Sequence, residues 1–391
     1  MVVVIVVIIV IAAIAGVILL SSTTTTTTPP TTSSYTSAST TSSVPTTSSS
    51  SSSSSSSATT SASSSLTPVT FGLSVAITIE YLPEYVAAHG GFWQQQGLNV
   101  NLQPFQGDGA HMQAVSSGQV QIGEASYVGE LNAISKGVPI KAIAMGLQQA
   151  DMVLIVSNTS KYTDPSQLKG ATIGVTTAGS ATDMMFHLLA AHYNFTIGTD
   201  IKELTAGGLT SQLAALTTNK TQGFFWTYET GYQLQTSGDA RILLFMNTII
   251  PNWAENTIYA TNSLISQNPT LVKKVLQGVY NALAYMETNK TYAVQMAEQY
   301  MSLSPQAANK TMTEAFASGQ FSTDGNFTSQ IIGGMNLART LMLNLNISSS
   351  LVPVNQSFTT QFVPITPQNV SPSPSAILPR LFVAATADSK V

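Results

Sequence analysis

The chain has 391 residues and a formal net charge of −4 at pH 7, and 8% of its residues are charged, against about 25% in ordinary soluble proteins. It contains no cysteine, which excludes structural disulfides, thiol catalysis and cysteine-ligated metal sites. The absence of a basic run excludes the electrostatic footprint of a nucleic-acid-binding protein. Such sparse charge would suit an acidic exterior, where carboxylates are protonated and repulsion between basic side chains is uncompensated.

The chain begins with an apolar segment, Val2–Leu20. It is long enough to cross a hydrocarbon core of roughly 30 Å as a helix, and longer than the ~7–15-residue apolar region of a signal peptide. We therefore expect residues 1–20 to form a transmembrane anchor, with cleavage of the segment as a signal, after Ala15, as the alternative. Residues 21–67 are a Ser/Thr-rich linker that cannot bury a core. This linker predicts a disordered stalk of the kind that is often O-glycosylated.

Asparagines in Asn-x-Ser/Thr sequons are frequent in the rest of the chain. Some are expected by chance in a sequence rich in Asn, Ser and Thr. Combined with the apolar segment and the stalk, they favour an extracellular domain of a surface-tethered archaeal glycoprotein. The candidates are Asn158, Asn194, Asn219, Asn289, Asn309, Asn326, Asn346, Asn355 and Asn369.

After the stalk, apolar strands alternate with helices. Strand patterns at 71–76, 98–102 and 118–124 are separated by helical patterns at 81–88 and 110–116. Strands that alternate with helices predict an α/β fold with a parallel sheet.

Glycine-containing motifs punctuate this pattern in a regular order: Gly91-Phe92-Trp93 with Gly97-Leu98, Gly118 to Gly123, Gly137 to Ala144, Leu168 to Val175, and Gly179-Ser180 to Asp183. This set resembles the solute-binding proteins of ABC importers for nitrate, sulfonate, taurine and thiamine-precursor ligands. The resemblance implies a type II periplasmic-binding-protein fold, in which two α/β lobes close on a small ligand. It also implies ABC-importer permease subunits as partners, and we expect a monomer.

The folded part is long enough for two lobes of ordinary domain size. We place lobe 1 at 68–152 and 257–365, the second of these parts being helical, and lobe 2 at 153–256. Residues 366–391 form a Pro-rich tail without clear periodicity.

In open α/β sheets, ligands bind at the carboxyl ends of strands, where helix N-termini present free N–H groups. This rule selects the ligand-binding candidates, and for several of them a structural role is the competing interpretation. Helix capping would explain Ser180, and a tight turn would explain Gly107. Trp226, Tyr228 and Glu229, in contrast, could stack on and hydrogen-bond a flat or cationic ligand. The candidates are Ser74, Thr78, Tyr81, Gly107, Asp108, Glu124, Tyr127, Gly179, Ser180, Thr182, Trp226, Tyr228, Glu229 and Asn256.

No Lys or Arg occurs before Lys136. An arginine-clamped sulfonate is therefore slightly disfavoured against a neutral or aromatic, pyrimidine-like ligand. The four histidines are scattered, and His187 and His192 lie five residues apart, which does not place them on one helical face. We therefore expect no enzyme, no cofactor and no metal site. The predicted function is extracellular capture of a small molecule for an ABC importer; the alternative is a non-transport, glycosylated structural or adhesion protein of the cell surface.

Overall fold

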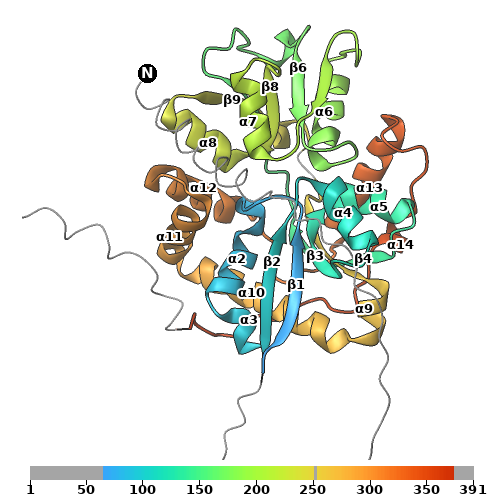
Figure 1. Ribbon diagram of the computed structural model, residues 1–391, viewed down its shortest axis with the longest axis vertical. Coiled ribbons are helices and arrows are strands. Elements are labelled where there is room, and N and C mark those ends of the chain that lie inside the picture. Colours follow the sequence, from blue (N-terminus) through green and yellow to red (C-terminus); the bar gives the residue numbers. More distant parts are fainter. Residues whose placement is uncertain (1–64, 251–252, 374–391) are drawn as a thin grey trace, which may run out of the picture. The chain divides into compact units, whose positions relative to one another are not determined.

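Two five-stranded sheets form the framework of the protein (Figure 1). The computed structural model describes residues 65–250 and 253–373. The first sheet has the order β2-β1-β3-β10-β4, and β1 is parallel to β2 and β3, whereas β10 is antiparallel to both of its neighbours. Its strands are β1 (Thr67–Leu73), β2 (Leu98–Pro104), β3 (Ile122–Ser126), β4 (Ile140–Leu147) and β10 (Asn256–Thr261).

The second sheet repeats this arrangement, with the order β7-β6-β8-β5-β9. Here β6 is parallel to β7 and β8, and β5 is antiparallel to β8 and β9. We call the first sheet with its helices lobe 1 and the second lobe 2. The strands of lobe 2 are β5 (Met152–Ser157), β6 (Thr172–Val175), β7 (Lys202–Thr205), β8 (Gly223–Thr227) and β9 (Ala240–Phe245).

The expected parallel sheet is found in part: both sheets are mixed, because each contains one strand that runs antiparallel to its neighbours. These strands, β5 and β10, are the first ones that the chain forms after it passes from one sheet to the other. Only residues 148–151 separate β5 from β4, so the chain passes directly from the first sheet into the second.

Helices cover both sheets. In lobe 2 they are η2 (Pro165–Gln167), α6 (Ala181–His192), α7 (Leu209–Thr217), α8 (Tyr228–Ser237) and η3 (Met246–Thr248). Between β1 and β4 of lobe 1 lie η1 (Ile79–Tyr81), α2 (Leu82–His89), α3 (Phe92–Gln95), α4 (Asp108–Ser116) and α5 (Tyr127–Ser135). After β10 follow α9 (Asn262–Gln267), α10 (Pro269–Thr288), α11 (Lys290–Met301), α12 (Pro305–Ser318), α13 (Ser329–Asn344) and α14 (Val354–Ser357).

The core of lobe 1 forms where β1 packs against α3 and α10. The rings of Phe71 and Trp93 lie 5.6 Å apart between centroids, and both side chains are fully buried. Trp93 Nε1 donates a hydrogen bond to the carbonyl of Val275 on α10, 2.9 Å away. Gly278, one turn further along α10, leaves the space for the indole ring, since a Cβ there would lie 2.1 Å from Trp93 Cδ1.

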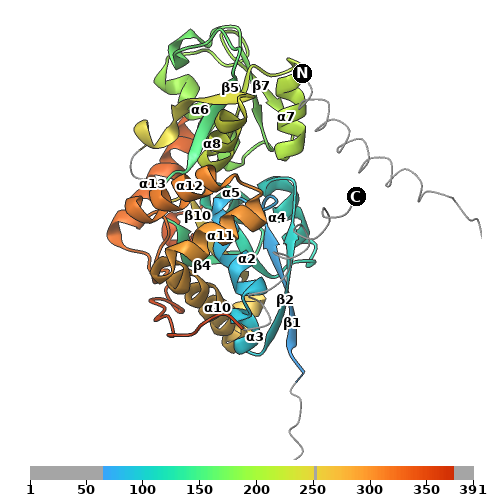
Figure 2. The same ribbon diagram turned by 90° about the vertical axis from the view of Figure 1, so that its left-hand side faces the viewer.

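Both ends of the described chain meet lobe 1 beside α3 (Figure 2). The Thr67 amide donates to the Gly97 carbonyl at 2.9 Å, just after α3. The Ser373 amide donates to the Gly90 carbonyl at 2.8 Å, just before α3, and Gln95 Nε2 donates to the Ser371 carbonyl at 2.9 Å. The described chain therefore enters and leaves lobe 1 at the amino end of β1. The loop that follows β1 lies at the other end of this strand.

Among the described residues, no helix is both long enough and apolar enough to cross a membrane. The predicted anchor, residues 1–20, lies outside the described residues, as does the stalk up to residue 64.

Candidate ligand-binding site

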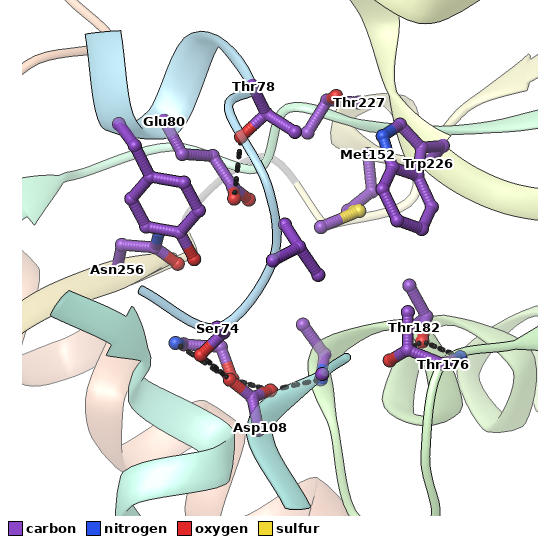
Figure 3. A pocket seen from close by; sticks show the side chains of 15 residues that line it. Ser74, Thr78, Glu80, Asp108, Met152, Thr176, Thr182, Trp226, Thr227 and Asn256 are labelled. Carbon is purple, nitrogen blue, oxygen red and sulfur yellow. Dashed lines mark hydrogen bonds between the residues drawn. The ribbon is translucent and has the colours of Figure 1, made fainter. Parts of the chain in front are cut away.

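A small cavity lies between the two lobes, at the carboxyl ends of their strands (Figure 3). It has a volume of about 30 Å³, which is room for one or two water molecules. Its walls come from the loop after β1, the end of β8 and the N-terminal turns of α4 and α6. The predicted residues that line it are Ser74, Thr78, Tyr81, Gly107, Asp108, Thr182, Trp226 and Asn256.

Three predicted residues lie just behind this wall. Glu229 accepts hydrogen bonds from Thr227 Oγ1 and from the Ile79 amide of lobe 1. Ser180 caps α6 and accepts a hydrogen bond from Thr176 Oγ1 at 2.9 Å. Gly179, with a φ of 75°, donates its amide to Asp183 Oδ2. These residues position the wall without lining the cavity.

Three further predicted residues point elsewhere. Glu124 lines a separate small cavity together with Glu84. Tyr127 is buried in the core, where its hydroxyl lies 2.9 Å from Ser357 Oγ. The Tyr228 hydroxyl donates to Gln320 Oε1 at 2.5 Å. β3 extends to Ser126, two residues past the end expected for it, and α5 therefore begins at Tyr127.

Sequence reasoning missed part of the wall. The most important of the missed residues is Glu80, the one acidic residue in the apolar run from Val75 to Leu82. Its apolar neighbours in the sequence indicate that Glu80 is buried. A buried acid without a basic partner is a candidate functional residue. The missed residues are Val75, Glu80, Ser126, Met152, Thr176, Ala181 and Thr227.

Asp108 organises the floor of the cavity. Ser74 Oγ donates to its Oδ1 at 2.5 Å, and Ser126 Oγ donates to its Oδ2 at 2.7 Å. The amide of Ala181, at the N-terminus of α6 in lobe 2, also donates to Oδ2 at 3.3 Å. A carboxylate at a helix N-terminus is favoured by the free N–H groups there. One side chain of lobe 1 thereby holds the N-terminal turn of α6.

Further hydrogen bonds join the lobes directly. The Gly109 amide donates to Thr177 Oγ1 at 3.2 Å, and the Gly208 amide donates to Gln106 Oε1, also at 3.2 Å. Gly107 has a φ of 110°, which favours glycine, and a Cβ there would lie 3.1 Å from Thr176. The structure is therefore a closed conformation, and a ligand larger than a few atoms requires the lobes to separate.

Besides Asp108, the carboxyl groups of Glu80, Asp151, Glu229 and Glu255 are buried at or next to the cavity. Burial, followed by the charges of Glu229 and Asp108, raises the pKa of Glu80 from 4.5 to about 8. Burial raises the pKa of Glu229 from 4.5 to about 7. Burial, followed by the charge of Glu80, also raises the pKa values of Asp151 and Glu255.

These acids have no basic partner among the described residues. The ion pairs of that part of the chain join Lys169 to Asp200 and His187 to Asp183, and none of these four residues lines the cavity. Both oxygens of Asp151 and of Glu255 are buried without a hydrogen-bond partner. Oxygens of these two residues and of Glu80 lie within 4.8 Å of one another. A cation or a group with several N–H or O–H donors would satisfy them.

Aromatic rings lie beside these acceptors. Trp226 is 4% exposed and lines the cavity, and its Nε1 has no hydrogen-bond partner. Tyr81 lies on the wall formed by the loop after β1, next to Glu80. Asn256, at the start of β10, has an unpartnered Nδ2. Rings next to unsatisfied polar groups form a site for a flat molecule that carries both donors and acceptors.

Comparisons with known proteins agree with this architecture. A family model described as "NMT1/THI5 like" matches residues 78–292, more than half of the 391-residue chain. The riboflavin-binding protein RibY of Chloroflexus aurantiacus is 25% identical over 313 residues, which cover 77% of this chain and 87% of the relative.

Two solved structures share the fold. A protein from Bordetella bronchiseptica RB50 has a TM-score of 0.65 and 22% identity, covering 75% of this chain and 95% of its own. The alkanesulfonate-binding protein SsuA from Xanthomonas axonopodis pv. citri, bound to MOPS, has a TM-score of 0.64 and 14% identity, covering 75% and 98%. These likenesses confirm the two-lobe α/β binding-protein fold that the glycine motifs implied.

Proposed function

We propose that this chain, which belongs to the NMT1/THI5-like family, captures a small solute outside the cell and delivers it to an ABC importer. The membership confirms the resemblance to solute-binding proteins that the glycine motifs indicated. RibY and SsuA are both binding proteins by description, which supports a binding function over a catalytic one.

The proposed ligand is rich in hydrogen-bond donors and is neutral or cationic. The observation that carries this proposal is the group of buried carboxyl groups at the cavity, which no lysine or arginine of the described residues neutralises. An anion placed here would find no lysine or arginine among the described residues of the cavity wall, and any of these carboxyl groups that is ionised would repel it at short range and low dielectric. Nitrate and the sulfonate group of an alkanesulfonate or of taurine are therefore poor fits.

The proposed ligand is also flat. Trp226 and Tyr81 offer ring surfaces, and the unpartnered amide of Asn256 can read a ring carbonyl or nitrogen. Riboflavin, the ligand named for the RibY relative, combines a flat ring system with hydroxyl and imide donors. We therefore expect a flavin-type or pyrimidine-type heteroaromatic molecule.

A thermal-shift screen of the full chain tests this proposal. Riboflavin and substituted pyrimidines form one arm, and alkanesulfonates, taurine and nitrate form the other. A ligand at 100 times its Kd should stabilise the protein by about 2.7 kcal/mol. Stabilisation by the sulfonates alone would refute the electrostatic argument. If no compound of either arm or of a wider metabolite panel stabilises the chain, the alternative of a non-transport surface protein gains.

We further propose that the domain is displayed on the outer face of the cell membrane as a glycoprotein, in an archaeon. This part rests on residues 1–20, on the stalk and on the exposure of the sequon asparagines. All of the nine except Asn326 are exposed, so their side chains are accessible to a transferase. Peptide mass spectrometry of the natural protein should find glycans on these asparagines. Full-length protein free in the medium and starting after Ala15 would contradict the anchor.

A further inference from the structure

We propose that lobe 2 carries a second binding site, outside the ligand cavity, in which Asp183, His187 and Glu203 hold a divalent transition-metal ion such as Zn²⁺. Their donor atoms all lie within 4.8 Å of one another. The set comprises one imidazole nitrogen and two carboxylates, which are ligand types that zinc accepts.

The fold brings these residues together from two elements. Asp183 and His187 are four residues apart on α6, which places both side chains on one face of the helix. Glu203 lies on β7, the edge strand next to β6. The sequence comparison of His187 with His192 did not find this site, because the partners of His187 are an acid one helical turn before it and an acid on a strand.

The distance between the donor atoms of His187 and Asp183 suits a shared zinc ion. His187 Nε2 lies 3.3 Å from Asp183 Oδ1. Zinc bonds to nitrogen and oxygen are about 2.0–2.2 Å long, so two ligands of a tetrahedral ion are separated by roughly 3.4 Å.

Asp183 itself is oriented toward this point. Its side chain is 5% exposed, and its Oδ1 is buried and accepts no hydrogen bond, although the imidazole nitrogen is close. Its other oxygen, Oδ2, accepts the Gly179 amide, which fixes the carboxylate. Such a second hydrogen bond is the usual way in which a metal ligand is held in place. An unsatisfied oxygen on a fixed carboxylate is a preformed ligand.

The local charge also favours a cation. Glu203 is half-buried, and its carboxyl group lies close to that of the buried Asp183. No lysine or arginine of the described residues pairs with either acid. A divalent ion would compensate two neighbouring carboxylates at once, and the partial exposure of His187 and Glu203 leaves a path for entry.

The ion would act on the ligand site through α6. Ala181 and Thr182, at the first turn of this helix, line the cavity, and Asp183 follows them directly. An ion shared with Glu203 would tie this turn to β7. The inference is independent of which solute the cavity binds, and it assigns the ion a structural role in holding the wall that lobe 2 contributes.

Calorimetric titration of the metal-free full chain with ZnCl₂ tests the site. We compare the wild type with His187→Gln, Glu203→Gln and the matched control His192→Gln, which changes an exposed histidine on the same helix. We expect one zinc ion bound by the wild type and the control. Each ligand variant should bind at least about 100-fold more weakly, the upper end of what loss of a supporting contact costs.

Two further measurements make the result decisive. Circular dichroism shows whether each variant folds; if His187→Gln does not, Glu203→Gln alone decides. The visible absorption of the Co²⁺-loaded wild type should show tetrahedral coordination, and His187→Gln or Glu203→Gln should remove it. Absence of zinc uptake by the wild type would overturn the proposal, and so would equal weakening in His187→Gln and His192→Gln.

Discussion

Replacing Glu229 by glutamine should remove a large part of the dependence of stability on pH. Burial raises the pKa of this carboxyl from 4.5 to about 7. The folded protein therefore holds the proton more tightly than the unfolded chain, and the stabilisation is complete below about pH 4.5. It is lost as the pH rises to about 7. At 1.36 kcal/mol per pKa unit, the loss is about 3 kcal/mol.

The variant should keep the local contacts. Glutamine at position 229 still presents an Oε1 that can accept from Thr227 Oγ1 and from the Ile79 amide. It has no proton to lose in this range. Between about pH 4.5 and 7.5, its free energy of unfolding should therefore fall by about 3 kcal/mol less than that of the wild type. The other buried acids contribute their own pH dependence to both proteins.

Urea unfolding of both proteins at several pH values across this range measures the difference. Asp239→Asn, which removes an exposed carboxylate, is the matched control and should follow the wild type. If the curves of Glu229→Gln and the wild type run parallel, Glu229 is already ionised in the folded protein. This outcome would refute the raised pKa of Glu229 but would leave the argument for a donor-rich ligand in place, because an ionised carboxylate only accepts hydrogen bonds.

Three other predictions concern the cavity and the core. Trp226→Ala should weaken ligand binding by about 1–3 kcal/mol, the range for loss of a buried aromatic anchor; unfolding of this variant would show instead that the ring is a core residue. In Gly107→Ala, the added methyl group meets Thr176 at 3.1 Å and the φ of 110° is strained. Small-angle scattering with saturating ligand should then show less compaction than in the wild type, and equal compaction would contradict closure at this point. Gly278→Ala should lower the free energy of unfolding by about 1–3 kcal/mol because it overpacks Trp93, which a denaturation curve shows directly; an unchanged midpoint would mean that α10 moves aside freely.

Local patterns in the sequence were sufficient for the elements that depend on neighbouring residues. The apolar run that begins at Met152 is one such element: it forms β5, Met152–Ser157, and all of its residues except Ser157 are buried. The start of η2 is another: the Asp164 side chain accepts a hydrogen bond from the Ser166 amide, and Pro165 is the first residue of this short helix. Both features are set by side chains within a few residues.

The partners that determine the site are distant in sequence, and no local pattern reports them. Glu80 lies in the segment after β1, whereas Asp151 and Glu255 lie in the two connections between the lobes. Their carboxyl groups come together only when these three segments meet. Tyr127 and Tyr228 were misplaced for a related reason. Their hydroxyls bond to Ser357 and Gln320, which come from segments that follow the second connection. For Tyr127, β3 also ends two residues later than expected, at Ser126.

The chain ends have a mechanical consequence. Both join lobe 1 beside α3, at the amino end of β1, whereas the cavity lies past the other end of this strand. A pulling force applied between these two ends is therefore borne by lobe 1 alone. It crosses neither connection to lobe 2 and does no work on the opening of the lobes. The affinity for a ligand should accordingly be the same in a protein pulled between these two ends as in one at rest.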